Sequence, residues 1–243
     1  YTHDVSGTDD GAQKNSAYGL ASMDAVTTGD FNSALGYESL SALNTGSNNS
    51  AVGHMALKLN TSGNENNAFG ADSLDANTTG SNNVAMGNGS LGANTTASNN
   101  VAIGTNALIL NTTGAENVAV GFAALDANTT ASYNTGIGHD ALGSNTTGAS
   151  NTAVGYNSMA VNTTGANNVA VGSSAMYANT TGASNVAIGT NAMQENTTGT
   201  RNLAIGFGAY DASDTENDNI AIGYNAMTTN TAGGQYNVAI GSY

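Results

Sequence analysis

The sequence lacks cysteine, proline and tryptophan, and it has only four phenylalanines among its 243 residues. Without cysteine the chain forms neither disulfides nor thiolate metal sites, although this says little about its redox compartment. A compact globule of this length normally encloses larger side chains than the alanine, valine, isoleucine and leucine that make up much of the apolar fraction. We therefore expect a thin, elongated hydrophobic core.

Positive charge is also scarce, because Lys14, Lys58 and Arg201 face 17 acidic residues and leave a formal net charge of −14. Such a field repels phosphate backbones and anionic lipid, so the sequence argues against nucleic acid and bare membrane surfaces as partners. No apolar run approaches the roughly 20 residues of a membrane span, and we expect no membrane insertion by this segment. The chain opens on Tyr1 rather than Met, which favours a processed form or a fragment.

The dominant feature that is present is a repeat. Glycine returns every 17 residues from Gly19 to Gly223 without a slip, and a further copy ends one residue late at Gly241. Such a short period is typical of a stacked solenoid, in which each unit buries its apolar face against its neighbours. We predict an all-β fold, a parallel β-solenoid of about fourteen 17-residue coils spanning residues 15–243. Residues 1–14 fit the repeat poorly and are expected to be an N-terminal capping or connecting segment.

A short strand is expected just before each glycine, as in Val101-Ala102-Ile103. Alternation along the strand places valine and isoleucine on one face and alanine on the other. The uninterrupted small residues predict close packing against the alanine face. We expect lateral association between chains through that face.

After the glycine, a small residue followed by leucine or methionine, as in Ala107-Leu108, predicts a second strand with the leucine column inward. The coil then closes with Asn-Thr-Thr-Gly or a near variant. Asparagine and threonine side chains bond their own backbone and glycine supplies a positive φ, so this segment is expected to be a turn.

Asparagine stands four residues before the glycine in every copy. In stacked strands about 4.8 Å apart, these amides are expected to form a hydrogen-bonded ladder with a structural role. The residues that represent this ladder and the glycine column are Asn100, Asn117, Asn185, Gly104, Gly121 and Gly189.

The strings Asn100-Val101-Ala102-Ile103-Gly104 and Asn185-Val186-Ala187-Ile188-Gly189 resemble the repeat of trimeric autotransporter adhesin heads of the YadA-like type. The resemblance covers about residues 15–241 and departs in period, which is shorter in those heads. Arrays with Asn-Thr-Thr-Gly corners are also similar to phage and virus tail-fibre shafts. Both resemblances imply a homotrimer that serves attachment.

The position after the repeat glycine varies and often holds an aromatic side chain. A variable position inside a rigid repeat is expected to point outward or into a lateral interface, where aromatic residues dock a receptor or glycan. Packing between subunits explains them equally well. This aromatic column comprises Tyr37, His54, Phe122, His139, Tyr156, Phe207 and Tyr224.

No catalytic residue is predicted, because no nucleophile, base and carboxylate stand at a recognisable spacing, and we expect neither enzymatic activity nor a cofactor. No metal site stands out. The nearest candidate is a calcium site at the acidic corner of Asp211, Asp214, Glu216 and Asp218, whose spacing is not that of a helix-loop-helix calcium loop. Solvated charge is the simpler interpretation.

The corner triplets are formally glycosylation sequons, although a turn that needs Asn and Thr produces sequons without any sugar. Two further sequons begin at Asn48 and Asn88. The candidate corner asparagines are Asn60, Asn77, Asn94, Asn111, Asn128, Asn145, Asn162, Asn179 and Asn196.

The sequence therefore predicts a structural and adhesive fibre protein, located extracellularly on a cell surface or virion, whose partners are copies of itself and a host or surface receptor or glycan. One alternative is a self-polymerising extracellular filament subunit, because coil ends are unpaired strand edges. Another is an ice-binding β-solenoid, favoured by the threonine columns. Consecutive threonines in a strand would point to opposite faces, which weakens this second alternative.

Overall fold

The computed structural model describes residues 14–211, 215–228 and 234–242. These residues contain short strands, turns and bends, and no helix. The chain divides into two compact units, Tyr1–Asn117 and Val118–Tyr243. Both units are built from the same coil, and the predicted parallel β-solenoid is confirmed.

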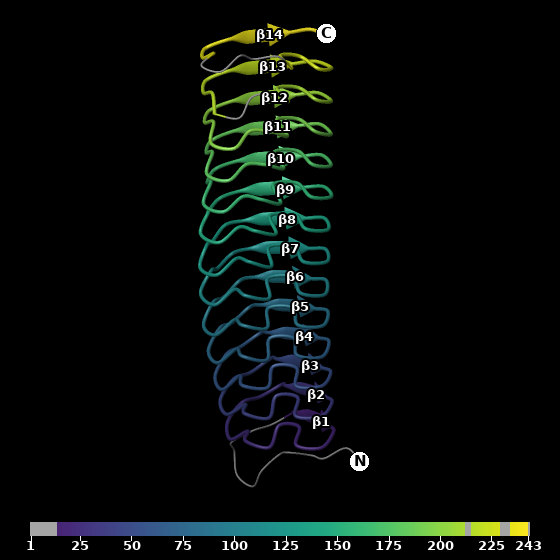
Figure 1. Cartoon of the computed structure of the whole chain (residues 1–243). Helices are drawn as coiled ribbons and strands as arrows, with labels where there is room; N and C mark the ends of the chain where they lie inside the picture. Colours follow the sequence, from purple (N-terminus) through teal and green to yellow (C-terminus); the bar gives the residue numbers. More distant parts are fainter. Residues whose placement is uncertain (1–13, 212–214, 229–233, 243) are drawn as a thin grey trace. The chain divides into compact units, whose positions relative to one another are not determined.

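The first unit contains six three-residue strands in its described part. Each pairs in parallel with the next, and the register joins residues 17 positions apart, as between Ala17 and Ala34 (Figure 1). The strands are β1 (Ser16–Tyr18), β2 (Ser33–Leu35), β3 (Ser50–Val52), β4 (Asn67–Phe69), β5 (Val84–Met86) and β6 (Val101–Ile103).

The second unit contains eight such strands in its described part, again paired in parallel from each to the next (Figure 1). Its last step is one residue longer, because Ala221 is in register with Ala239. The strands are β7 (Val118–Val120), β8 (Thr135–Ile137), β9 (Thr152–Val154), β10 (Val169–Val171), β11 (Val186–Ile188), β12 (Leu203–Ile205), β13 (Ile220–Ile222) and β14 (Val238–Ile240).

The repeat glycine ends each strand, and its lack of a side chain is what permits the stacking. Gly155 has a φ of +137°, which L side chains rarely adopt, and a Cβ there would lie 2.4 Å from the carbonyl oxygen of Gly172 in the next coil. Both the backbone conformation and the coil spacing therefore demand glycine. The coils stack as closely as they do because this column carries no side chain.

The interior of each coil is narrow. Ala102 of β6 and Leu108 of the following turn are both fully buried, and the same two columns are buried in nearly every coil. The predicted inward leucine and methionine column is therefore confirmed. Bulky residues enter the core from one wall, and alanine lines the opposite wall.

Two expectations about the coil are wrong. The alanine face points into the core, since Ala102 is 0% exposed whereas Ile103 is 38% exposed, so lateral association through alanine is not possible. A coil of 17 residues encloses too little space for valine or isoleucine opposite leucine, and the bulky strand residues therefore point outward.

The predicted second strand is also absent from the described coils. The segment after the glycine is a run of turns in which left-handed residues alternate, with φ of +57° at Met55 and +52° at Leu57. Its amides bond both within the turn and to the next coil: Lys58 N donates to Met55 O at 3.1 Å, and Leu57 N donates to Ser73 O at 3.0 Å. These bonds between coils stabilise a backbone that sequence propensity disfavours.

Candidate functional site

The outward side of the strands carries two rows of side chains, from the first and the third residue of each strand. The third-residue row is apolar throughout; its members are exposed in the first unit, whereas Val120, Val154, Ile205 and Ile222 of the second unit are only partly exposed. In the first unit its members are 36% to 58% exposed: Tyr18, Leu35, Val52, Phe69, Met86 and Ile103. In the second unit the third strand residue is valine or isoleucine, and its exposed members include Ile137, Val171, Ile188 and Ile240.

The first-residue row changes character within the first unit. It is polar in β1 to β4, with Ser16, Ser33, Ser50 and Asn67, and apolar in β5 and β6, where valine takes the position. In the second unit it is mostly Val, Leu or Ile, with threonine only in β8 and β9. The outward side is therefore apolar across both rows except at β1 to β4, β8 and β9.

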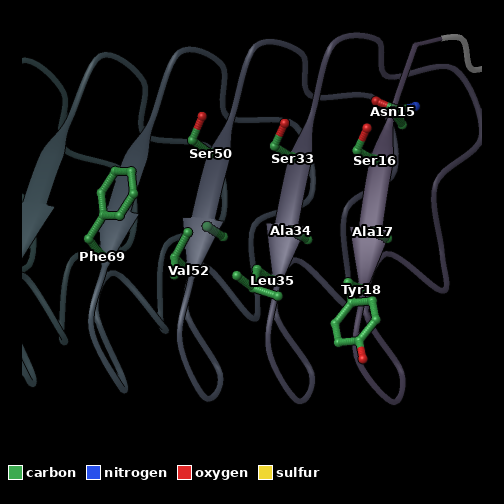
Figure 2. A pocket seen from close by; sticks show the side chains of 11 residues that line it. Asn15, Ser16, Ala17, Tyr18, Ser33, Ala34, Leu35, Ser50, Val52 and Phe69 are labelled. Atoms are coloured by element: carbon green, nitrogen blue, oxygen red, sulfur yellow. The ribbon is translucent and has the colours of Figure 1, made fainter. Parts of the chain in front are cut away.

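A groove of about 600 Å³ lies over β1 to β4. Figure 2 shows the serines of β1, β2 and β3 in one line, and Tyr18, Leu35, Val52 and Phe69 in a second line parallel to it. The two aromatic rings stand at its ends, with the aliphatic side chains between them. We call this feature the β1–β4 groove.

The aromatic column is exposed at all seven predicted positions, and its members stack along the coils. Ring centroids are 5.5 Å apart between Tyr37 and His54, and the ring of His139 lies between Phe122 and Tyr156, at 5.2 and 5.4 Å. Phe207 and Tyr224 stack at 5.5 Å. Each of these contacts covers one face of each of its two rings, and the ring of His139 has a ring neighbour on both sides.

A histidine–carboxylate contact and an ion pair lie beside this column in the first unit. Nδ1 of His54 lies 3.4 Å from a carboxylate oxygen of Asp72. Nζ of Lys58 lies 2.6 Å from Oε2 of Glu38, and this contact lowers the pKa of Glu38. These pairs join neighbouring coils at the surface, where each pair contributes little to stability.

The predicted asparagine ladder is present. Nδ2 of Asn117 donates to Oδ1 of Asn100 at 3.2 Å, and the backbone N of Asn117 donates to the same oxygen at 2.9 Å. In the second unit the backbone N of Asn202 donates to Oδ1 of Asn185 at 2.9 Å. A second ladder, not anticipated from the sequence, runs through the corner asparagines.

The nine corner asparagines proposed as glycosylation candidates are all 0% exposed. Nδ2 of Asn162, for example, donates to Oδ1 of Asn145 at 2.7 Å and to the carbonyl of Gly165 at 3.0 Å. The folded coil does not present these amides at its surface. By contrast, the side chains of Asn48 and Asn88 are exposed.

The acidic corner is only partly described, because Asp214 lies outside the described residues. The carboxylate of Asp218 accepts hydrogen bonds from Nε and Nη2 of Arg201, at 2.6 and 2.8 Å, which lowers its pKa. Burial, and then the charge of Glu195, raise the pKa of Asp211. Glu216 is buried, and its backbone oxygen accepts from Nδ2 of Asn202 at 2.7 Å.

Metal ligation finds little support elsewhere. Within the described ranges, no three His, Cys, Asp or Glu side chains gather closely enough to hold an ion. Two partly buried carboxyl groups, Asp75 and Asp126, have raised pKa values, mainly through burial and secondly through the charges of Asp72 and Asp140 respectively.

Sequence reasoning did not anticipate the outward apolar row or the β1–β4 groove. A signal was present in the sequence, because the first strand position is serine or asparagine in β1 to β4 and valine in β5 and β6. This change does not predict an outward row as long as the alanine face of the strand is taken to point outward.

No described helix is long and apolar enough to cross a bilayer. Comparisons of the chain with protein-family models, with curated proteins and with solved structures give no match.

Proposed function

We propose that the chain is the repeat region of an extracellular adhesive fibre in which three copies associate laterally through their outward strand rows. The observation that carries the proposal is the apolar third-residue row, in which Met86 is 43% exposed and Ile188 is 41% exposed. Continuous apolar surface of this kind marks interaction sites in soluble proteins.

The energetics of one coil favour the same proposal. A coil buries about one leucine or methionine and two alanines, whereas ordering each residue of its backbone costs about 1–2 kcal/mol. Stacking supplies the main-chain bonds and the asparagine ladders. Burial of the third-residue row between copies stabilises the assembly by about 25 cal/mol for each Å² of apolar surface removed from water.

The resemblance to trimeric adhesin heads and fibre shafts supports three copies rather than two. An extracellular location on a cell surface or virion belongs to the same proposal, as do the absence of catalysis and a host or surface receptor as partner. The net charge of −14 keeps such a fibre soluble and does not favour nucleic acid.

The solution mass tests the assembly. Light scattering behind size exclusion is expected to give about 72 kDa, three times the 24.0 kDa of one chain. Ile103→Glu and Ile188→Glu place a charge in the outward row of the first and the second unit, and each is expected to shift the mass toward 24 kDa. Thr164→Glu, at an exposed corner, is the matched control and retains the wild-type mass.

A stable 24 kDa monomer for the wild-type chain would refute lateral association. An open-ended polymer would instead identify a self-polymerising filament subunit. The adhesive part is tested separately, by binding of the labelled wild-type protein to cells or surfaces, with the two glutamate variants as comparison.

One specific observation supports the alternative function of ice binding. The second threonine of the corners is exposed in successive coils of the second unit, as at Thr147, Thr164 and Thr181. The first threonine uses its hydroxyl within the protein, because Oγ1 of Thr146 donates to the carbonyl of Thr163 at 3.0 Å. Among the corner threonines described in the second unit, only the second-threonine row keeps its hydroxyls available, so we rank this function second. Thermal hysteresis of the wild-type protein tests it.

A further inference from the structure

We propose that the β1–β4 groove binds an uncharged oligosaccharide. The inference deepens the adhesive function proposed above and rests on it, because it assigns the receptor-binding role to one place and one ligand chemistry.

The groove has the dimensions of a ligand site. Its volume of about 600 Å³ lies within the range of 300–1,000 Å³ that small-molecule sites occupy. Tyr18 and Phe69 are separated by three coil steps, or about 14 Å at the usual strand spacing. An extended ligand of several rings fits that length, whereas a single small molecule does not span it.

The apolar line of the groove suits the faces of sugar rings. Tyr18 and Phe69 are 58% and 41% exposed, and in Figure 2 the face of each ring is turned toward the viewer, with the ring of Tyr18 just beyond the end of β1. Leu35 and Val52 lie in the same line between them and are aliphatic. A pyranose ring presents C–H groups on its face, and aromatic rings are large, rigid apolar platforms for such a face.

The polar line suits the edges of the same rings. Ser16, Ser33 and Ser50 stand in register at one coil spacing, and no described residue forms a hydrogen bond with their hydroxyl groups. Each hydroxyl has a donor and two acceptor positions available for a ligand hydroxyl. An aromatic and aliphatic line beside a parallel hydroxyl line matches a ligand that is apolar on its faces and hydroxylated along its edges.

Charge selects a neutral ligand. No Asp, Glu, Lys, Arg or His lines the described groove, and the chain as a whole carries a net charge of −14. An anionic sugar would meet no cation in the groove and would be repelled by the field of the protein. The ligand class is therefore an uncharged oligosaccharide rather than a sialylated or sulfated one.

A second copy of the chain fits this part of the strand face less well. Contact between copies is most favourable where both outward rows are apolar and can be buried together. In the first unit this part of the strand face begins at β5, with Val84 and Met86. Over β1 to β4, such a contact would bury the three serine hydroxyls, at a cost of about 1–3 kcal/mol for each one left without a partner. Association through β5 and β6 leaves the groove open.

Titration of the full 243-residue chain with cellotetraose, maltotetraose and chitotetraose, followed by calorimetry or ligand-observed NMR, tests the proposal. At least one of the three is expected to bind with a dissociation constant of about 1 mM or tighter. Tyr18→Ala and Phe69→Ala are each expected to weaken binding about tenfold, which corresponds to ~1.4 kcal/mol. Ser33→Val, which installs the residue found at this position in β5 and β6, is expected to weaken it as well.

Tyr156→Ala is the matched control, because this residue is 56% exposed but belongs to the aromatic column of the second unit. Its affinity is expected to equal that of the wild type. Loss of binding in Tyr156→Ala with retention in Tyr18→Ala would overturn the groove assignment. Absence of binding by all three tetrasaccharides up to about 10 mM, or equally tight binding of 3′-sialyllactose, would overturn the ligand class.

These outcomes are separable from failure of the fibre proposal. The solution mass and the melting temperature are measured on the same samples, and all of these substitutions are at exposed positions where little change in stability is expected. A protein with the trimer mass that binds no sugar would refute sugar binding at the groove but would agree with the proposed fibre. A monomer that binds a tetrasaccharide through Tyr18 would refute lateral association but would agree with sugar binding at the groove.

Discussion

Nδ2 of Asn77 donates a hydrogen bond to Oδ1 of Asn60 at 2.8 Å, and the same nitrogen donates to the carbonyl of Gly80 at 3.0 Å. One bond joins two coils and the other closes the corner within one coil. Because both asparagines are fully buried, these bonds have no competition from water. The corner asparagine is therefore a structural link between coils and not only a turn residue.

Asn94→Ala tests this link at the next step of the ladder. Nδ2 of Asn94 donates to Oδ1 of Asn77 at 2.9 Å and to Ala97 O at 3.1 Å, and its side-chain oxygen accepts from Nδ2 of Asn111. Removing the amide leaves buried polar groups without partners, so we expect a loss of about 3 kcal/mol in the free energy of unfolding. Chemical denaturation followed by circular dichroism measures it.

Asn88→Ala provides the control for that experiment. Asn88 is exposed, and its side chain makes one long hydrogen bond, 3.3 Å to Ala71 O. We expect a change within about 0.5 kcal/mol. Equal losses for Asn88→Ala and Asn94→Ala would show that the corner ladder has no special role.

Gly155→Ala is expected to destabilise the second unit by more than about 3 kcal/mol, because it combines a disfavoured backbone conformation with a clash against the next coil. The clashing atom is the Gly172 carbonyl oxygen, a backbone atom that cannot rotate away. Gly92→Ala is the comparison, since Gly92 does not have a positive φ. A Cβ at this position would lie 3.2 Å from its nearest neighbour, the carbonyl oxygen of Gly89. Chemical denaturation measures the loss in the free energy of unfolding for both variants. A much larger loss for Gly155→Ala indicates strain specific to the glycine column, whereas equal losses would indicate that the coil tolerates no larger residue at either position.

The sequence was sufficient for the period, the strand that ends at each glycine, the inward leucine column and the asparagine ladder. Alternation along Val101-Ala102-Ile103 defined two faces of the strand but not which one is inside. That choice depends on the width of the coil, which admits only alanine opposite Leu108. The turn around Met55 and Leu57 was missed because positive φ at such residues is unfavourable locally and is stabilised by bonds to neighbouring coils.

Asp126→Asn is expected to stabilise the protein at neutral pH. Burial and then the charge of Asp140 raise the pKa of Asp126, so the folded state binds its proton more tightly than the unfolded state does. Its contribution to stability therefore falls as the pH rises from the unfolded-state value of about 3.9 through the folded-state pKa. The melting temperature of the variant is expected to exceed that of the wild type at pH 7, and the difference is expected to vanish below about pH 4.

Asp218→Asn is expected to act in the opposite direction. The hydrogen bonds from Arg201 lower the pKa of Asp218, so the pair stabilises the folded state above the unfolded-state pKa and loses this effect as the pH falls. Its melting temperature is expected to lie below that of the wild type at pH 7 and to approach it in acid. The same sign of change at pH 7 for both aspartates would contradict this assignment.

Secretion from a glycosylating host is expected to modify Asn48 and Asn88 and none of the nine corner asparagines. An N-linked sugar replaces one of the two hydrogens on Nδ2, and at Asn111 that nitrogen already donates both to Asn94 and to Gly114 inside the coil. A corner modified before folding would leave the coil unable to close, and such chains are expected to be retained in the cell. Glycopeptide mass spectrometry of the secreted protein locates the sugars, and Asn88→Gln is expected to remove one of the two. Sugar at Asn111 in folded, secreted protein would show that the corner amides are accessible and that the ladder tolerates their loss.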